Sequence, residues 1–216
     1  MASMARVSTA SEWPLRPLAA VTDRIFLGLA DARQRGGGEE REVAVLNVRD
    51  VNDGRVPPVE TLATRTVPVA ADVERYTVRA NDVVITCRGT QLKVANITPP
   101  SEGALISANL IAIRAGAELL PAVLLAFLQS AEGQKALLQR GRSSTSSISL
   151  TPKAVSELSI PLPPLQVQKQ IAELISSAAE NYVSAIRAAE QRRAVAHAVA
   201  GGLLWGKLRS DQTERA

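Results

Sequence analysis

The chain has 216 residues and few of the side chains on which enzyme catalysis most often depends. Its one cysteine, Cys87, excludes an internal disulfide and a zinc site built from several thiolates. Its one histidine, His197, removes most histidine-based catalysis and lies far from Cys87 along the chain. We interpret Cys87 as a buried structural thiol in a strand and His197 as an incidental side chain on a helix face.

Aromatic residues are also scarce, at 3%, so the core must consist of Ala, Val, Leu and Ile. No apolar run reaches the roughly 18 residues of a membrane helix, and the N-terminus lacks the hydrophobic stretch of a secretory signal. With 46% hydrophobic and 21% charged residues, the composition is that of a folded protein. We therefore expect a cytoplasmic, soluble protein of one to two domains.

The basic excess is modest, with 25 Lys and Arg against 21 Asp and Glu and a net charge of +4. Arginine outnumbers lysine, and its rigid fork of donors suits phosphate oxygens and guanine edges. A genome rich in arginine and alanine codons explains the same bias equally well. Charge alone therefore does not assign a nucleic-acid partner.

The chain before residue 165 mixes strand and helix signals. Short β-branched runs predict strands over 43–48, 83–87, 92–97 and 109–114, and the Asn52, Asp53, Gly54 sequence predicts a turn. Leucines and alanines at helical spacing predict helices over 119–129 and 133–139. Thr151 and Pro152 are typical of a helix start, whereas the serine-rich segment 141–149 indicates a loop. The predicted fold class is α+β.

A single long helix is predicted from Leu165 to about Ala200, with a length of roughly 50 Å. Its apolar positions are spaced alternately by four and three residues, which forms a heptad-like seam. The seam consists of Ile171, Ile175, Ala178, Tyr182, Ala185 and Ala189. Because such a helix is longer than one small domain can bury, we expect it to meet a second long helix. A helix lying across its own domain is the alternative.

The segment Gly201–Lys207 has the spacing of a phosphate-binding P-loop, but Leu208 stands where that loop needs Ser or Thr. A helix also precedes the glycines, where a P-loop needs a strand. We interpret Gly201 and Gly202 as the stop of the long helix, followed by an apolar anchor at 203–205. A nucleotide-dependent enzyme is therefore disfavoured. That hypothesis predicts that Lys207→Ala abolishes ATP binding.

Two polar loops carry side chains that suit DNA. Residues 139–147 join Arg140 and Arg142 to a row of hydroxyl donors, and residues 88–93 carry Arg, Thr, Gln and Lys. Such groups bind phosphate oxygens, and arginine also reaches base edges. An ordinary solvated loop explains either segment taken alone.

Three segments in this order, 75–97, 109–130 and 141–175, resemble the DNA specificity (S) subunit of type I restriction–modification systems. The most specific piece is Leu158–Pro164 (LSIPLPP), followed by Gln168 and Ile171, which matches the family's pattern at the start of a long helix. The resemblance extends from about Trp13 to Leu208.

The resemblance implies a subunit without catalytic activity or a cofactor of its own, whose target-recognition domain reads one half of a split double-stranded DNA site. In this family, a long helix follows each such domain. Two of these helices pack as an antiparallel coiled coil, which acts as a spacer and docks the adenine methyltransferase subunits. The methyltransferase uses S-adenosylmethionine, and the separate motor-nuclease subunit of restriction systems uses ATP.

The resemblance also implies which residues approach DNA, because the two polar loops occupy the family's DNA-facing regions. We single out Arg88 and Arg142 as the DNA-facing residues of these loops. The full set of expected DNA contacts is Arg88, Thr90, Lys93, Arg140, Arg142, Ser144 and Thr145. The six seam residues are the expected helix-pairing positions.

The family usually carries two recognition domains and two helices, whereas this chain has one of each and no internal repeat. We expect a flexible N-terminus over 1–12, a target-recognition domain over 13–164, a spacer helix with an apolar end over 165–208 and a flexible tail over 209–216. Such a half-subunit needs a partner. A second copy predicts a palindromic split site, and a different half-subunit predicts an asymmetric one.

Two alternatives remain open at this stage. One is that the chain is a coiled-coil scaffold that only docks proteins. The other is that it is the remnant of a longer gene. The sequence does not give the DNA target, and it does not distinguish a restriction system from phage defence by methylation alone.

Overall fold

The computed structural model describes residues 13–30, 39–69, 73–141 and 147–206. The chain divides into two compact units, Met1–Ala172 and Glu173–Ala216. Every strand and every short helix of the described residues belongs to the first unit, and the second continues the long helix. The fold is α+β, as the sequence predicts. The expected flexible ends, 1–12 and 209–216, lie outside the described residues.

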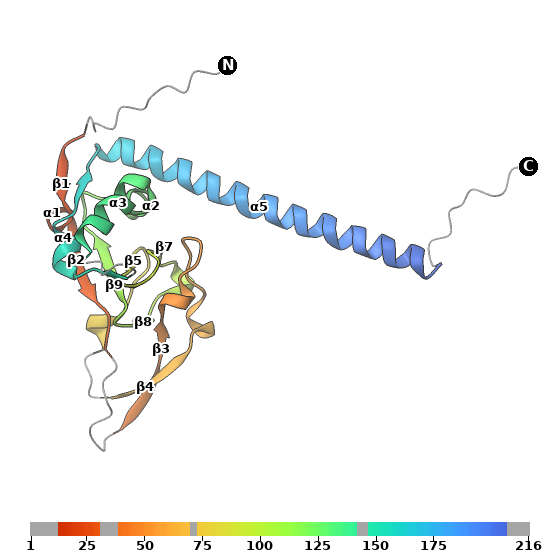
Figure 1. Ribbon diagram of the computed structural model, residues 1–216, viewed down its shortest axis with the longest axis horizontal. Coiled ribbons are helices and arrows are strands. Elements are labelled where there is room, and N and C mark those ends of the chain that lie inside the picture. The colour runs from red at the N-terminus through yellow and green to blue at the C-terminus, as the bar shows by residue number, and fades with distance from the viewer. Residues whose placement is uncertain (1–12, 31–38, 70–72, 142–146, 207–216) are drawn as a thin grey trace, which may run out of the picture. The chain divides into compact units, whose positions relative to one another are not determined.

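A four-stranded antiparallel sheet forms the centre of the first unit (Figure 1). Its order is β2 (Thr22–Leu27), β9 (Leu110–Ala115), β5 (Val83–Thr86) and β7 (Val94–Asn96). Val84 of β5 pairs with Ala112 of β9 on one side and with Ala95 of β7 on the other. The predictions for the last three of these strands are confirmed, whereas β2 is not predicted by its mixed polar and apolar sequence.

Both faces of this sheet are buried. Val83, Ile85 and Ile111 belong to one hydrophobic core, and Val84 and Ala112 belong to another. A strand covered on both faces reads as a continuous apolar run without alternation, which is the pattern of residues 83–87.

Helices contribute to the first of these cores: α1 (Leu18–Val21), α2 (Pro121–Gln129), α3 (Ala131–Arg140) and α4 (Pro152–Ser156). The hydroxyl of Ser130 accepts a hydrogen bond of 3.1 Å from the Gly133 amide at the start of α3. The Thr151 hydroxyl accepts one of 3.1 Å from Ala154 and so caps α4 as predicted.

A second sheet contributes to the opposite core. It has the order β4 (Thr64–Pro68), β3 (Glu40–Leu46) and β8 (Leu105–Ile106), with β3 and β8 parallel. Leu46 and Ile106 of this sheet pack in the same core as Val84. Four 3₁₀ turns complete the connections: η1 (Val48–Asp50), η2 (Val59–Thr61), η3 (Glu74–Tyr76) and η4 (Pro99–Ser101).

A buried ion pair joins the start of β5 to β9. Nε and Nη2 of Arg114 donate to the two carboxylate oxygens of Asp82, over 2.8 and 2.7 Å. The Arg79 amide donates to the same carboxylate over 2.8 Å, and Asp82 is only 1% exposed. Hydrogen bonding to this carboxylate raises the pKa of the Arg114 guanidinium. The ion pair and its hydrogen bonds therefore offset the free-energy cost of burying the Asp82 carboxylate.

The long helix α5 (Leu165–Leu204) begins directly after a short ribbon in which β1 (Leu15–Pro17) pairs with β11 (Ser159–Pro161). Its first turn is fixed by Gln168, which is buried. The Gln168 amide nitrogen donates to the carbonyls of Glu118 and Pro163, over 2.8 and 2.9 Å, and its oxygen accepts from the Leu120 amide over 2.8 Å. These bonds explain why a glutamine stands at this point of the motif.

The predicted long helix is confirmed, but the predicted stop at Gly201 and Gly202 is wrong. Both glycines lie inside α5, which continues to Leu204. Gly206, with φ +64°, adopts the left-handed conformation beyond the helix end, and its amide donates to the Leu203 carbonyl over 3.1 Å. No helix of the described residues is long and apolar enough to cross a membrane.

The seam residues on α5 differ in exposure. Tyr182 is 61% exposed, and the three alanines of the seam are exposed as well. Ile175 is half-buried, and Ile171 is half-buried against the core of the first unit. The predicted pairing of these residues with a second helix stays a prediction.

Candidate nucleic-acid interface

Residues 88–89 of the first polar loop pair with residues 148–149, which directly follow the second polar loop. β6 (Arg88–Gly89) pairs antiparallel with β10 (Ile148–Ser149), so that Arg88 lies opposite Ser149 and Gly89 opposite Ile148. We call these four residues the recognition ribbon. Arg88, Gly89 and Ser149 are exposed, and Ile148 packs against the core. The ribbon thus presents a guanidinium and a hydroxyl to solvent on a backbone that the core holds in place.

Buried groups fix the base of the ribbon. The amide of Leu150 donates to the Cys87 carbonyl over 2.8 Å, which continues the pairing toward the core. The Thr86 hydroxyl, also buried, donates to the Gln91 carbonyl and accepts from the Lys93 amide, both over 2.9 Å. The turn from 87 to 92 is therefore closed at its base, and exposed Thr90 lies near its tip.

Cys87 is a structural residue, as the sequence analysis interprets it. Its side chain is fully buried, and its sulfur lies 3.5 Å from the Ala108 carbonyl. Burial raises the pKa of the Cys87 thiol to about 11, and the charge of Arg88 opposes this only in part. Because the thiolate is the reactive form of cysteine, the thiol is inert near neutral pH.

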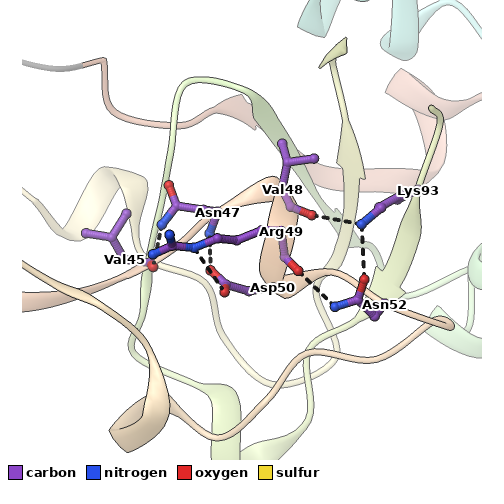
Figure 2. Close-up of polar contacts among 7 residues, drawn as sticks. All are labelled: Val45, Asn47, Val48, Arg49, Asp50, Asn52 and Lys93. Carbon is purple, nitrogen blue, oxygen red and sulfur yellow. Dashed lines mark hydrogen bonds and ion pairs between the residues drawn. The ribbon is translucent and has the colours of Figure 1, made fainter. Parts of the chain in front are cut away.

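Lys93 is held against a neighbouring loop (Figure 2). Its ammonium donates to the Val48 carbonyl over 3.3 Å and to Oδ1 of Asn52 over 3.1 Å. Lys93 therefore ties the start of β7 to the segment 48–52. Its expected contact with DNA stays a prediction, and the structure adds a second role as a support for this segment.

The segment 47–55 is a polar loop that the sequence analysis recognises only as a turn. The Asn47 amide donates to the Asp50 carboxylate over 2.9 Å, and the Asn52 amide side chain donates to the Arg49 carbonyl over 2.8 Å (Figure 2). Asp53 and Gly54 have positive φ angles of 48° and 75°, as the predicted turn requires. This loop carries two exposed arginines beside Lys93: Arg55, and Arg49, whose Nε lies 3.7 Å from Oδ1 of Asp50.

The loop 47–55 and the end of the turn 87–92 line one open cavity of about 440 Å³. Residues 51–54 line it from one side and residues 91–94 from the other, with two glutamines of α2 and α3 completing it, Gln129 and Gln134. No sequence signal joins these segments, because their proximity depends on long-range contacts such as the hydrogen bond of 3.3 Å from the Asn96 amide to the Gly54 carbonyl.

Of the remaining expected DNA contacts, Arg140 is the last residue of α3. Arg140 is exposed, and its guanidinium donates to the Glu157 carbonyl over 3.0 Å, which ties α3 to the end of α4. Arg142, Ser144 and Thr145 lie outside the described residues. The described residue closest to them on the C-terminal side, Ser147, leads directly into β10.

The described residues contain no group of three or more His, Cys, Asp and Glu side chains that could hold a metal ion. His197 is an exposed residue of α5. What the interface offers chemically is hydrogen-bond donors and positive charge on a supported backbone, the groups that bind phosphates and base edges.

Comparison with known proteins agrees with this arrangement. The sequence profile of the type I restriction modification DNA specificity domain matches residues 46–187, about two thirds of the chain. The chain therefore belongs to this family. Specificity subunits of the family are the non-catalytic DNA-recognition subunits of restriction–modification complexes, and DNA target recognition is the role that membership indicates. No curated protein matches the chain.

Solved structures show the same fold. A chain from a study of complex assembly and conformational transition of the type I R-M system matches with TM-score 0.61 and 22% identity over 97% of this chain. The HsdS subunit from Thermoanaerobacter tengcongensis matches with TM-score 0.53 and 21% identity over 86%. The type I S subunit from M. genitalium matches with TM-score 0.54 and 15% identity over 94%. This chain spans 49%, 42% and 48% of those chains, respectively.

Proposed function

We propose that this chain recognises one half of a split double-stranded DNA site and targets an adenine-N6 methyltransferase to it. In a restriction system, the same complex carries a motor-nuclease subunit. Residues 13–164 form the target-recognition domain, and 165–208 form the spacer helix that pairs with another helix and docks the methyltransferase. The protein acts in the cytoplasm, where its DNA target is present.

The observation that carries this proposal is the recognition ribbon. Two segments that carry donors for DNA, separated by about sixty residues of sequence, pair with each other at β6 and β10. Both strands lie within the part of the chain that matches the family profile. Exposed donors on a backbone fixed by a core are the arrangement that reads DNA without large rearrangement.

The second support is what the described residues contain, one globular unit followed by one long helix. We propose that this globular unit reads one half of a split site together with a second recognition unit. A second copy gives a palindromic site, and a different half-subunit gives an asymmetric one.

The proposal is tested by selection from a random pool of duplex DNA. The chain is purified as a complex with a co-expressed type I methyltransferase subunit, and bound duplexes are sequenced. We expect enrichment of a motif in two parts with a fixed spacing. The matched control is the complex with Arg88→Ala, which we expect to enrich the motif less strongly.

A stable complex that enriches no motif would favour the scaffold alternative, in which the helix docks proteins and the loops play no part. In that case Ile175→Asp breaks the complex, and charge changes in the two loops change nothing. The two hypotheses therefore differ in the loop variants, which weaken DNA recognition only if the chain reads DNA, whereas Ile175→Asp is expected to break the complex under both.

A further inference from the structure

The open cavity between the loop 47–55 and the turn 87–92 adjoins the recognition ribbon. We call it the glutamine cavity, and it is lined by residues 51–54, residues 91–94, Gln129 and Gln134. The turn that carries Arg88 and Gly89 of the ribbon also carries Gln91 of the cavity wall. Because residues 88–91 are all exposed, the ribbon and the cavity form one continuous surface.

The lining of the glutamine cavity does not suit a protein partner or an apolar small molecule. None of the exposed large hydrophobic side chains of the described residues lines it, whereas the core of a protein interface is apolar. The cavity is open and its wall is largely polar, whereas small-molecule sites are enclosed and mostly apolar. Its amide groups instead suit the polar edge of a base pair.

Two polar groups of the cavity wall are bonded to each other. The Lys93 ammonium donates to Oδ1 of Asn52 over 3.1 Å, and the Asn52 amide nitrogen donates to the Arg49 carbonyl over 2.8 Å (Figure 2). These bonds stabilise the wall but occupy the side chain of Asn52. The two glutamines are the lining residues whose side chains are held in place and still have a free acceptor.

Gln129, the last residue of α2, is exposed but held by two contacts. Its Nε2 donates to the Val94 carbonyl over 3.4 Å. Gly54 lies against the same nitrogen, because a Cβ added at Gly54 would be 2.7 Å from it. Position 54 therefore needs glycine for space as well as for its φ of +75°. The Oε1 of Gln129 has no hydrogen-bond partner among the described residues.

Gln134 of α3 is half-buried, and its Nε2 donates to the Leu128 carbonyl over 2.7 Å. Its position beside the end of α2 depends on Gly133, where an added Cβ would clash with the Phe127 carbonyl oxygen. Within the described part of the chain, the Oε1 of Gln134 also has no partner. Each of the two amides is thus held through its nitrogen and retains a free oxygen.

We propose that Gln129 and Gln134 are specificity-determining residues that read adenine in the DNA half-site. An amide offers an acceptor and a donor side by side, which complements the N6 amino group and the N7 of adenine. One of the two N–H groups of each amide is used within the protein, so the second is available to N7. This inference rests on the proposed DNA recognition and assigns the base that this part of the surface selects.

The way in which the two amides are held favours them over Gln91. The side chain of Gln91 is exposed and has no hydrogen-bond partner among the residues that the structure describes. It would lose rotamer freedom on binding a base, whereas Gln129 and Gln134 are already oriented and lose less. Groups that are oriented before the ligand binds discriminate best between ligands of similar shape.

Selection from a random pool of duplex DNA tests this assignment position by position. The chain is used as its complex with a co-expressed type I methyltransferase subunit. We expect Gln129→Ala to lower the preference for adenine at one position of the motif by about five- to 150-fold, the discrimination of one bidentate contact. Preferences at the other positions should stay. Lys135→Ala, an exposed change on α3 outside the cavity, is the control that keeps every preference.

Two charged substitutions test the chemistry of the contact. Gln129→Glu puts a group that only accepts in place of the amide, and a carboxylate pairs with the amino group of cytosine. Gln134→Lys retains N–H donors but has no acceptor, and an ammonium pairs with O6 and N7 of guanine. We expect the selected base to change from adenine to cytosine in the first variant and from adenine to guanine in the second. A purely structural role at the end of α2 would not change the base that is selected.

Unchanged base preferences in all the glutamine variants would overturn this proposal and leave DNA recognition established. A uniform loss of affinity for all sequences, in a variant whose thermal unfolding is unchanged, indicates a phosphate contact and overturns it as well. If the wild-type complex enriches no motif, the proposed DNA recognition fails and this assignment fails with it. The failure of the assignment alone is therefore distinguishable from the failure of the proposed function.

Discussion

Arg88 and Ser149 lie opposite each other in a two-stranded ribbon, although they are far apart in the sequence. This pairing places the exposed Arg88 opposite the exposed Ser149, above a base fixed by the buried Thr86 and Cys87. The ribbon is the feature of the fold on which the proposed DNA recognition depends.

We predict that Arg88→Ala weakens DNA binding without unfolding the protein. If Arg88 reads a base edge, specific binding falls by about 1–3 kcal/mol while non-specific binding changes little. If it contacts a phosphate, binding to all DNA sequences weakens by a similar factor. The slope of log K against log salt concentration then falls in magnitude by about one. Titrations at several salt concentrations separate the two cases. Lys153→Ala, an exposed change on α4, is the matched control, and equal binding by both variants would remove Arg88 from the interface.

Lys93 has a structural role that is measurable apart from DNA. Lys93→Met removes the bonds to the Val48 carbonyl and to Asn52, and we expect the free energy of unfolding to fall by about 1 kcal/mol. The loosened loop also becomes a better substrate for trypsin at the exposed Arg49. Urea titration and limited proteolysis measure the two effects. A variant as stable and as resistant as wild type would show that the ammonium does not support the loop.

Loss of the ion pair between Asp82 and Arg114 is expected to destabilise the fold strongly. Asp82→Ala leaves the guanidinium of Arg114 without its carboxylate in a largely buried position. Removal of one partner of a buried pair costs about 3–5 kcal/mol, and thermal or urea unfolding measures it. Glu42→Ala, an exposed change on β3, should stay within about 0.5 kcal/mol of wild type. Similar small effects for both variants would contradict the assigned role of the pair.

Gln168 joins the first turn of α5 to the globular unit. Gln168→Ala removes three hydrogen bonds, and loss of the buried one leaves the Pro163 carbonyl without this partner at a cost of about 1–3 kcal/mol. Gln170→Ala changes an exposed residue of the same helix and is expected to be nearly neutral. Hydrogen exchange at the Leu120 amide reports the loss directly. Slow exchange there in the Gln168 variant would show that the side chain does not protect this junction.

Elements with a strong local signal were predictable from the sequence. The cap at Thr151, the Asp53 and Gly54 turn and the long run of helical spacing after Leu165 each reflect chemistry within a few residues. The strand β2 was not predictable, because its six residues mix charged and apolar side chains and depend on pairing with β9. The helix end was misplaced because glycine is tolerated within a helix at a modest cost.

The site was predictable only as two separate loops. Residue types at Arg88 and in the serine-rich segment suggested DNA, and the family resemblance placed both in DNA-facing regions. The pairing of β6 with β10 depends on the whole core, which no local pattern encodes. The hydrogen bond from Lys93 to the Val48 carbonyl likewise depends on long-range packing. The sequence predicted this lysine only as a DNA contact, and its structural role was missed.

The central claim is that this chain directs methylation to a DNA sequence. Its most direct test is co-expression with a type I methyltransferase subunit in a host without DNA methylation, followed by sequencing that detects modified bases. The account predicts N6-methyladenine within a motif of two separated parts, absent when this chain is omitted. Methylation of the same motif without the chain, or no motif although the two proteins form a complex, would contradict it.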